Sequence, residues 1–127
     1  MEHSQRFLDL VNGAKKVITE CTPEDLNEKL DAQQPFVLID CRESSEWAQG
    51  SIPKAKHLCK GIIERDIENM CPDLGADIVV YCGGGYRSAL AVQNLQKMGY
   101  HNIVSLADGF RGWKEKAFPI TIPSTDV

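Results

Sequence analysis

The stretch DIVVYCGGGYRS, residues 77–88, decides the fold. Its apolar run at 78–81 is typical of a strand that is covered on both faces in a parallel sheet. The run leads through Cys82 and three glycines into a helix whose apolar positions, Ala91, Leu95 and Met98, share one face. A buried strand, a tight loop and an amphipathic helix in this order predict a unit of an α/β fold.

The same alternation extends over the rest of the chain. Strands are predicted at 16–21, 36–39, 55–59, 77–81 and 102–106, and helices at 23–32, 45–49, 62–70, 87–98 and 109–116. Residues 1–15 are expected to form an N-terminal arm or helix, residues 16–118 the domain itself, and residues 119–127 an irregular tail. We therefore predict a single α/β domain with a mostly parallel five-stranded sheet and helices on both faces.

The composition is that of an ordinary soluble globular protein. Of 127 residues 43% are hydrophobic and 25% charged, and 14 basic against 18 acidic residues give a formal net charge of −4. The acidic total disfavours nucleic-acid binding, and no apolar run reaches the ~18 residues of a membrane span. The N-terminus lacks the basic start and apolar stretch of a secretion signal, so we expect a cytoplasmic protein.

The cysteines are five in number, and no two are separated by only two residues. This spacing disfavours a zinc ribbon and a thioredoxin-type pair, and we expect no metal site. In a reducing cytosol most of these thiols are expected to be small buried hydrophobic side chains. The neighbours of each cysteine must therefore identify a reactive one.

Cys82 has such neighbours, because ligands of open parallel sheets bind beyond the carboxyl ends of the strands. Gly83, Gly84 and Gly85 allow backbone conformations closed to other residues, so that successive N–H groups can point to one centre. These N–H groups, the helix dipole and Arg87 predict a pocket for an anion and a lowered pKa of the Cys82 thiol. The simpler interpretation is a flexible turn beside an inert cysteine. A nucleotide-binding P-loop is excluded, because no Gly-Lys-Ser/Thr follows.

The loop Cys82-Gly83-Gly84-Gly85-Tyr86-Arg87-Ser88 resembles the Cys-x-x-Gly-x-Arg-Ser loop of the rhodanese family of sulfurtransferases. Two flanking stretches are similar to further motifs of that family, in the same order. They are Asp40-Cys41-Arg42-Glu43 with Glu46-Trp47 and Gly50-Ser51-Ile52-Pro53, and Asp108-Gly109-Phe110-Arg111-Gly112-Trp113. Ser51 and Lys54 stand where the family usually has His and Gly, which affects the expected local geometry. The resemblance covers about residues 16–118.

The resemblance implies a rhodanese-like fold and a two-step sulfur transfer without metal or organic cofactor. Cys82 would take the outer sulfur of thiosulfate or a related small anionic donor, and the resulting persulfide would pass it to a thiol or cyanide. A protein that accepts the persulfide sulfur is a further expected partner. Gly83, Gly84, Gly85, Tyr86 and Arg87 would bind the substrate, with the N–H groups holding the persulfide charge and Tyr86 on the rim.

The three residues that follow the predicted strand at 36–39 are Asp40, Cys41 and Arg42, and each has two possible roles. Asp40 and Arg42 lie on the same side of the sheet as Cys82, either at the edge of the active site or, as we favour, in an ion pair that ties their loop. Cys41 between them should face away from both neighbours. It is either a resolving thiol or, as we favour, a buried structural cysteine.

Two other functions compete with a thiosulfate sulfurtransferase. Phosphatases and arsenate reductases of the same fold have five residues between Cys and Arg, whereas this chain has only the four residues 83–86 between Cys82 and Arg87. This count disfavours oxyanion chemistry. A module that binds a protein partner without catalysis, or that carries a persulfide to it, would retain the same fold. Inactive relatives typically lack the cysteine, which this chain retains.

Overall fold

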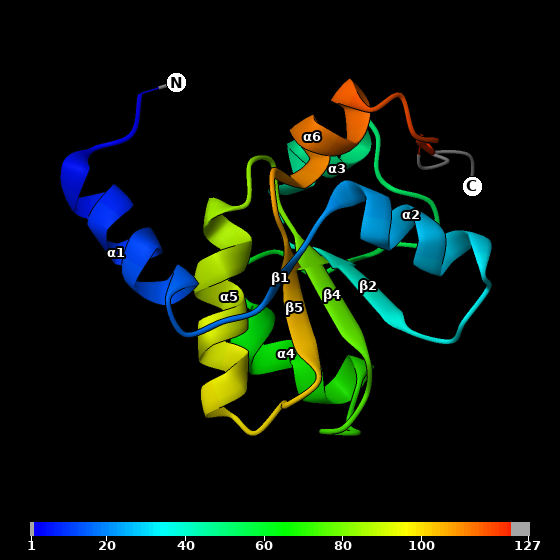
Figure 1. Cartoon of the computed structure of the whole chain (residues 1–127). Coiled ribbons are helices and arrows are strands. Elements are labelled where there is room, and N and C mark those ends of the chain that lie inside the picture. Colours follow the sequence, from blue (N-terminus) through cyan, green and yellow to red (C-terminus); the bar gives the residue numbers. More distant parts are fainter. Residues whose placement is uncertain (1, 123–127) are drawn as a thin grey trace.

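Five parallel strands form the centre of the molecule (Figure 1). The structure is a computed structural model, and it describes residues 2–122. The strands are β1 (Glu20–Cys21), β2 (Val37–Asp40), β3 (Lys56–His57), β4 (Ile78–Tyr81) and β5 (Ile103–Leu106). Their spatial order is β1-β5-β4-β2-β3, so β4 lies in the middle between β5 and β2. The predicted α/β class with a five-stranded parallel sheet is confirmed.

Helices cover both faces of this sheet. They are α1 (Gln5–Lys15), α2 (Pro23–Asp31), α3 (Ser44–Ala48), α4 (Ile63–Met70), α5 (Tyr86–Lys97) and α6 (Gly109–Glu115). Helices α4 and α5 pack on one face, whereas α2 and α6 pack on the other (Figure 1). Side chains of β4 alternate between the two layers, with Val80 in the first and Val79 in the second. The central strand is thereby buried on both faces, as its apolar run predicts.

The two edge strands are shorter than predicted. Residues 16–21 and 55–59 contribute only two strand residues each, because β1 pairs with β5 alone and β3 pairs with β2 alone. Residues 16–17 form a turn that directly follows α1. The helix predicted at 23 begins there, since Thr22 and Asp25 form reciprocal side-chain to backbone hydrogen bonds at its N-terminus.

The segment after α6 is more regular than predicted. Thr121 forms an antiparallel bridge with Ser51, and the indole N–H of Trp113 donates a hydrogen bond to the carbonyl of Pro119 at 2.7 Å. Residues 123–127 of the predicted tail lie outside the described residues. Lys54 stands where the similar motif usually has glycine. Its φ of 71° lies in the left-handed region, which glycine adopts without steric strain.

Candidate active site

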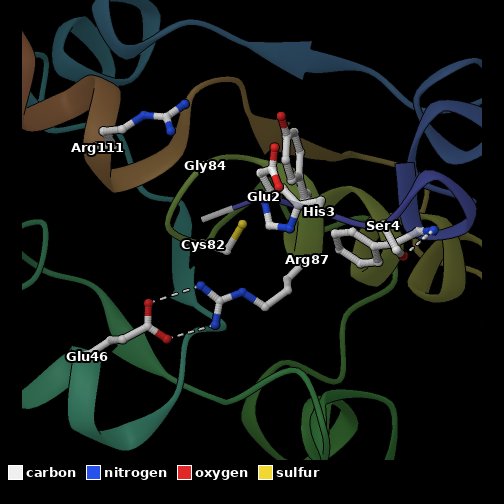
Figure 2. A pocket seen from close by; sticks show the side chains of 10 residues that line it. Glu2, His3, Ser4, Glu46, Cys82, Gly84, Arg87 and Arg111 are labelled. Carbon is white, nitrogen blue, oxygen red and sulfur yellow. Dashed lines mark hydrogen bonds and ion pairs between the residues drawn. The ribbon is translucent and has the colours of Figure 1, made fainter. Parts of the chain in front are cut away.

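Cys82 directly follows β4, and the loop to α5 folds around its sulfur (Figure 2). The backbone N–H of Gly85 donates a hydrogen bond to Sγ at 3.1 Å, and that of Ser88 donates one at 3.4 Å. The Ser88 hydroxyl lies 3.5 Å from the same sulfur. Because the side chain of Cys82 is only 1% exposed, these donors take the place of water around a thiolate.

The same contacts lower the pKa of Cys82 from its ordinary 9.0 to about 5. The largest cause is a hydrogen bond from the Cys41 thiol, followed by burial, which acts in the opposite direction, and then by the contacts with Ser88 and Gly85. Hydrogen bonds to the charged form thus outweigh its desolvation. At neutral pH Cys82 is therefore a thiolate, the form of cysteine that acts as a nucleophile.

Cys41 lies next to Cys82 because of the strand register. Asp40 pairs with Tyr81, and the N–H of Cys41 donates a hydrogen bond to the Tyr81 carbonyl at 2.9 Å. The two cysteines thus follow adjacent parallel strands in register. The hydrogen bond with Cys82 and burial raise the pKa of Cys41 well above its usual value, so it stays a protonated donor. Cys41 is buried, as predicted, but the sequence analysis missed its contact with the reactive sulfur.

Ser105 extends this network across to β5. The hydroxyls of Ser88 and Ser105 lie 2.8 Å apart, and neither residue is exposed to solvent. A hydroxyl has a single proton to donate. When Ser88 donates to the Cys82 thiolate, Ser105 must therefore donate to Ser88. Ser105 comes from a strand 17 positions after Ser88, and no local sequence signal links the two.

One glycine of the loop has a left-handed conformation. Of the three glycines only Gly85 has a positive φ, 92°, and it ends the loop as the N-cap of α5. The backbone N–H groups of Phe110 and Arg111 hold the other end by donating to the carbonyls of Cys82 and Gly83 at 2.8 and 2.9 Å. Gly85 is thus the one of these three glycines that uses a left-handed conformation closed to most other residues.

Gly109 makes the contact between the loop and α6 possible. A Cβ at this position would lie 2.5 Å from the Cys82 carbonyl oxygen, and its φ is 54°. Only glycine lets the first turn of α6 approach the loop this closely. A trans peptide places its N–H opposite its C=O. The N–H groups of Gly83 and Gly84 therefore point away from α6.

Arg87 is paired with Glu46 of α3. Its guanidinium donates two hydrogen bonds to the Glu46 carboxylate, at 2.8 and 3.0 Å (Figure 2). This bidentate contact lowers the pKa of Glu46 and raises that of Arg87, so both stay charged. Arg87 lies beside Cys82 as expected, but its charge is already compensated. Glu46 was quoted only as part of a motif, and its role beside Arg87 was missed.

A cavity of about 640 Å³ opens above Cys82. Of the five loop residues predicted to bind the substrate, Gly84, Tyr86 and Arg87 line this cavity, whereas Gly83 and Gly85 are not part of its lining within residues 2–122. Glu46 and Arg111 add charged groups. Its remaining wall comes from the N-terminal segment: Glu2, His3, Ser4 and Phe7 (Figure 2). Arg111 and this segment were not predicted as parts of the site.

Asp40 and Arg42 form a buried ion pair away from this cavity. The Arg42 side chain donates to both carboxylate oxygens of Asp40, with a shortest contact of 2.7 Å, and also to the Gly50 carbonyl at 2.6 Å. Its guanidinium carbon lies 4.3 Å from the centre of the Phe110 ring. Neither residue belongs to the cavity lining given by residues 2–122. The geometry is that of the favoured ion pair.

The other cysteines are placed apart from this site. All five cysteines are free thiols, and burial raises the pKa of Cys21 to about 11.

Within residues 2–122, no group of three His, Cys, Asp or Glu side chains has the arrangement of a metal site. Over the same residues, no helix has the length and apolar character needed to cross a membrane.

The chain is similar to proteins of one known family. A model of the rhodanese-like domain matches residues 22–116. An Allochromatium vinosum protein named sulfurtransferase is 32% identical over 107 residues, which cover 84% of this chain and 98% of that protein. The putative sulfur carrier protein YrkF of Bacillus subtilis is 26% identical over 99 residues, 78% of this chain and 52% of its own. A rhodanese-like domain protein from Staphylococcus aureus has a TM-score of 0.74 at 29% identity, covering 84% of this chain and all (100%) of its own.

The low pKa of Cys82 is testable by the pH dependence of its alkylation with iodoacetamide, followed by mass spectrometry of the Cys82 peptide. We expect the wild-type rate to be half-maximal near pH 5. Loss of one charged hydrogen bond, worth about 1.5–3 kcal/mol, should raise the midpoint of Ser88→Ala by about 1–2 pH units. Ser45→Ala, an exposed serine on α3, is the control. A wild-type midpoint near the ordinary cysteine pKa of 9.0 would contradict the hydrogen-bond network.

The ion pair of Asp40 and Arg42 is testable by chemical denaturation. Arg42→Ala leaves the buried Asp40 carboxylate without its partner and should lower the free energy of unfolding by about 3–5 kcal/mol. Arg65→Ala, which removes an exposed partner of Asp66, should cost at most about 1 kcal/mol. Folded Arg42→Ala should keep the wild-type pH midpoint of Cys82 alkylation. A stable variant with an altered midpoint would instead place Arg42 at the edge of the site.

Proposed function

The chain belongs to the rhodanese-like domain family, and we propose that it is a sulfurtransferase that carries the transferred sulfur as a persulfide on Cys82. The observation that carries this proposal is a buried cysteine with a pKa of about 5 at the base of an open cavity. A thiolate stabilised by fixed hydrogen bonds is both a nucleophile toward sulfur and a good leaving group from a persulfide.

The proposed reaction has two steps. The Cys82 thiolate attacks the outer sulfur of thiosulfate or a related donor, the bond between the two donor sulfurs breaks, and sulfite leaves with that electron pair. Cys82 then carries an anionic persulfide. In the second step cyanide or a thiol takes the outer sulfur, giving thiocyanate or a new persulfide, and Cys82 is released as a thiolate. The sequence of two half-reactions predicts ping-pong kinetics.

The loop and its surroundings support both steps. The loop N–H groups, fixed by α6 on one side and by α5 on the other, are suited to hold the negative charge on either Cys82 sulfur species. Arg87 contributes a positive charge beside the sulfur, while Glu46 fixes its position. The five free thiols favour a reducing compartment such as the cytoplasm.

A persulfide carrier that serves a protein partner is the second candidate. It rests on the same Cys82 chemistry, and the likeness to the putative carrier of Bacillus subtilis favours it. The sulfurtransferase and the carrier differ only in whether the protein turns over repeatedly with small acceptors. A carrier accepts one sulfur and passes it to one partner, whereas a sulfurtransferase turns over with cyanide or small thiols.

Replacement of the nucleophile tests the proposed function. Cys82→Ser should abolish thiosulfate:cyanide sulfur transfer and persulfide formation while the protein stays folded, because a serine hydroxyl is not ionised at neutral pH. The measurements are steady-state thiocyanate formation and the intact mass after incubation with thiosulfate, with gain of one sulfur atom expected for the wild type only. Cys41→Ser is the comparison variant and should retain transfer, because a serine hydroxyl still donates a hydrogen bond toward the Cys82 sulfur. Sulfur gained by Cys82→Ser would place the nucleophile elsewhere.

Loop length should separate sulfur transfer from phosphatase chemistry. Four residues between Cys82 and Arg87 leave space for a single sulfur, whereas related oxyanion enzymes have five. Insertion of one glycine between Gly84 and Gly85 should abolish sulfur transfer, because the N–H of Gly85 is displaced from the sulfur, and should tighten phosphate binding measured by calorimetry. The wild type should hydrolyse no phosphate ester. Undiminished sulfur transfer by the longer loop would show that loop length does not select the reaction.

A further inference from the structure

The N-terminal segment supplies one wall of the cavity above Cys82, although it lies outside the residues 22–116 that match the family. Glu2, His3, Ser4 and Phe7 all line the cavity from this side (Figure 2). The reactive loop is thus common to the family, whereas this wall is not part of the matched region. Such a wall is a place where the substrate preference of an individual protein can be set.

Packing against α5 fixes the segment in place. Helix α1 lies beside α5 (Figure 1). Val11 and Ala14 of α1 form a buried cluster with Ala89 of α5. Ser4 caps α1 by accepting a hydrogen bond from the N–H of Phe7 at 3.3 Å. The cap and the buried cluster hold both ends of the helix, so the residues before it have a defined position over the cavity.

Three aromatic rings form the apolar part of the wall. The ring of His3 lies edge-on to Tyr86 with centroids 4.8 Å apart and lies 5.2 Å from the ring of Phe7. Phe7 and Tyr86 are 6.2 Å apart, also edge-on. Tyr86 belongs to the reactive loop, so this cluster joins the N-terminal segment directly to the residues that surround Cys82.

Arg111 is the cation of the cavity that is most available to a ligand. Arg87 is held by two hydrogen bonds to Glu46, whereas Arg111 reaches a carboxylate only at 4.0 Å, that of Glu115. Both side chains of the latter pair are largely exposed, at 66% and 70%, so water weakens their attraction. Arg111 extends from α6 toward Gly84 (Figure 2).

We propose that these groups form the binding site of the sulfur acceptor, and that the acceptor is a small organic thiol with a carboxylate. Its carbon skeleton packs against His3, Phe7 and Tyr86, its carboxylate pairs with Arg111, and its sulfur reaches the persulfide on Cys82. A volume of about 640 Å³ lies within the ~300–1,000 Å³ of small-molecule sites. The sulfur of Cys82 lies at the base of the cavity and is nearly inaccessible, which disfavours the thiol of a folded protein.

This inference rests on the proposed sulfur transfer and concerns its second step. The acceptor thiol gives its proton to the outer sulfur of the anionic Cys82 persulfide, and the resulting acceptor thiolate attacks that sulfur. The bond between the two sulfurs breaks, and Cys82 leaves as a thiolate. The acceptor becomes a persulfide that carries the transferred proton, so no oxidant or reductant is needed.

Three-carbon thiols that differ at the far end provide the test: mercaptopropionate, mercaptopropanol and mercaptopropylamine. Protein loaded with thiosulfate, or with inorganic polysulfide, is mixed with each thiol at equal thiolate concentration, and loss of the Cys82 sulfur is followed by mass. Wild type should react about tenfold or more faster with the carboxylate than with the alcohol, as expected for one charged hydrogen bond. The amine should react slowest of the three thiols. If the amine reacts fastest, the Glu2 carboxylate rather than Arg111 determines which thiol binds, and the proposal is overturned.

Variants assign the effect to residues. Arg111→Gln should bring the rates of carboxylate and alcohol together, whereas Arg65→Gln, an exposed arginine on α4, should not. His3→Ala and Phe7→Ala should slow both thiols several-fold more than they slow discharge by cyanide, because cyanide has no carbon skeleton to pack against these rings. Leu10→Ala is the matched control, because Leu10 is 60% exposed on the same helix. His3→Ala removes no residue of the buried cluster, so it separates a loss of the wall from a loss of folding.

The outcomes distinguish this inference from the proposed function. An unchanged preference in Arg111→Gln overturns the carboxylate site. Faster discharge of His3→Ala by the single thiol of serum albumin shows that the segment is a cover and also overturns the inference. If no persulfide forms, the proposed function fails, and the site is judged by binding alone. In that case S-methyl mercaptopropionate should protect Cys82 from iodoacetamide in the wild type and not in Arg111→Gln, and equal protection rejects the site.

Discussion

The contact between the first turn of α6 and the loop after β4 is the constraint on which the site depends. Two backbone N–H groups, of Phe110 and Arg111, hold the carbonyls of Cys82 and Gly83. Because a peptide unit is planar and trans, fixing these carbonyls also fixes the N–H groups on the opposite side of the loop. The N–H groups of Gly83 and Gly84 are thus oriented before any substrate arrives, beside those of Gly85 and Ser88, which donate to the sulfur. Orientation in advance is the main source of electrostatic stabilisation in enzyme sites, since no reorganisation is needed during the reaction.

A buried thiolate is stable here only because it has several donors at once. Burial alone would raise the pKa of Cys82, and each hydrogen bond from Cys41, Ser88 and Gly85 acts in the opposite direction. These donors come from the residue that follows β2, from the loop and from α5. The low pKa is therefore a property of the assembled sheet rather than of the loop sequence. Ser105 on β5 adds a fourth element, because its proton orients the Ser88 hydroxyl.

The parts of the molecule that sequence reasoning predicted are those set by local patterns. The run at 78–81, the cysteine and the following helix are contiguous, and their order alone indicates the class of fold and the position of the reactive thiol. What it missed depends on contacts between distant residues. Glu46 reaches Arg87 across 41 positions, and the contact of Cys41 with Cys82 follows from strand register. Strand lengths at the sheet edges were also overpredicted, because pairing there depends on a neighbour on one side only.

The matched region, residues 22–116, holds the reactive sulfur, whereas the N-terminal segment lines the cavity above it. These separate roles have a physical reason. The groups that stabilise sulfur charge must be held rigidly, and they lie between the central strand and two helices. The groups on the far side of the cavity, Glu2, His3, Ser4 and Phe7, belong to neither layer that covers the sheet. The pKa of Cys82 is set instead by contacts with Cys41, Ser88 and Gly85. Arg87, the cation nearest the loop, already has its carboxylate in Glu46 and so has little charge left to discriminate among anions. Selectivity among substrates therefore falls to the outer groups, of which Arg111 and the three-ring cluster are the ones in reach of Cys82.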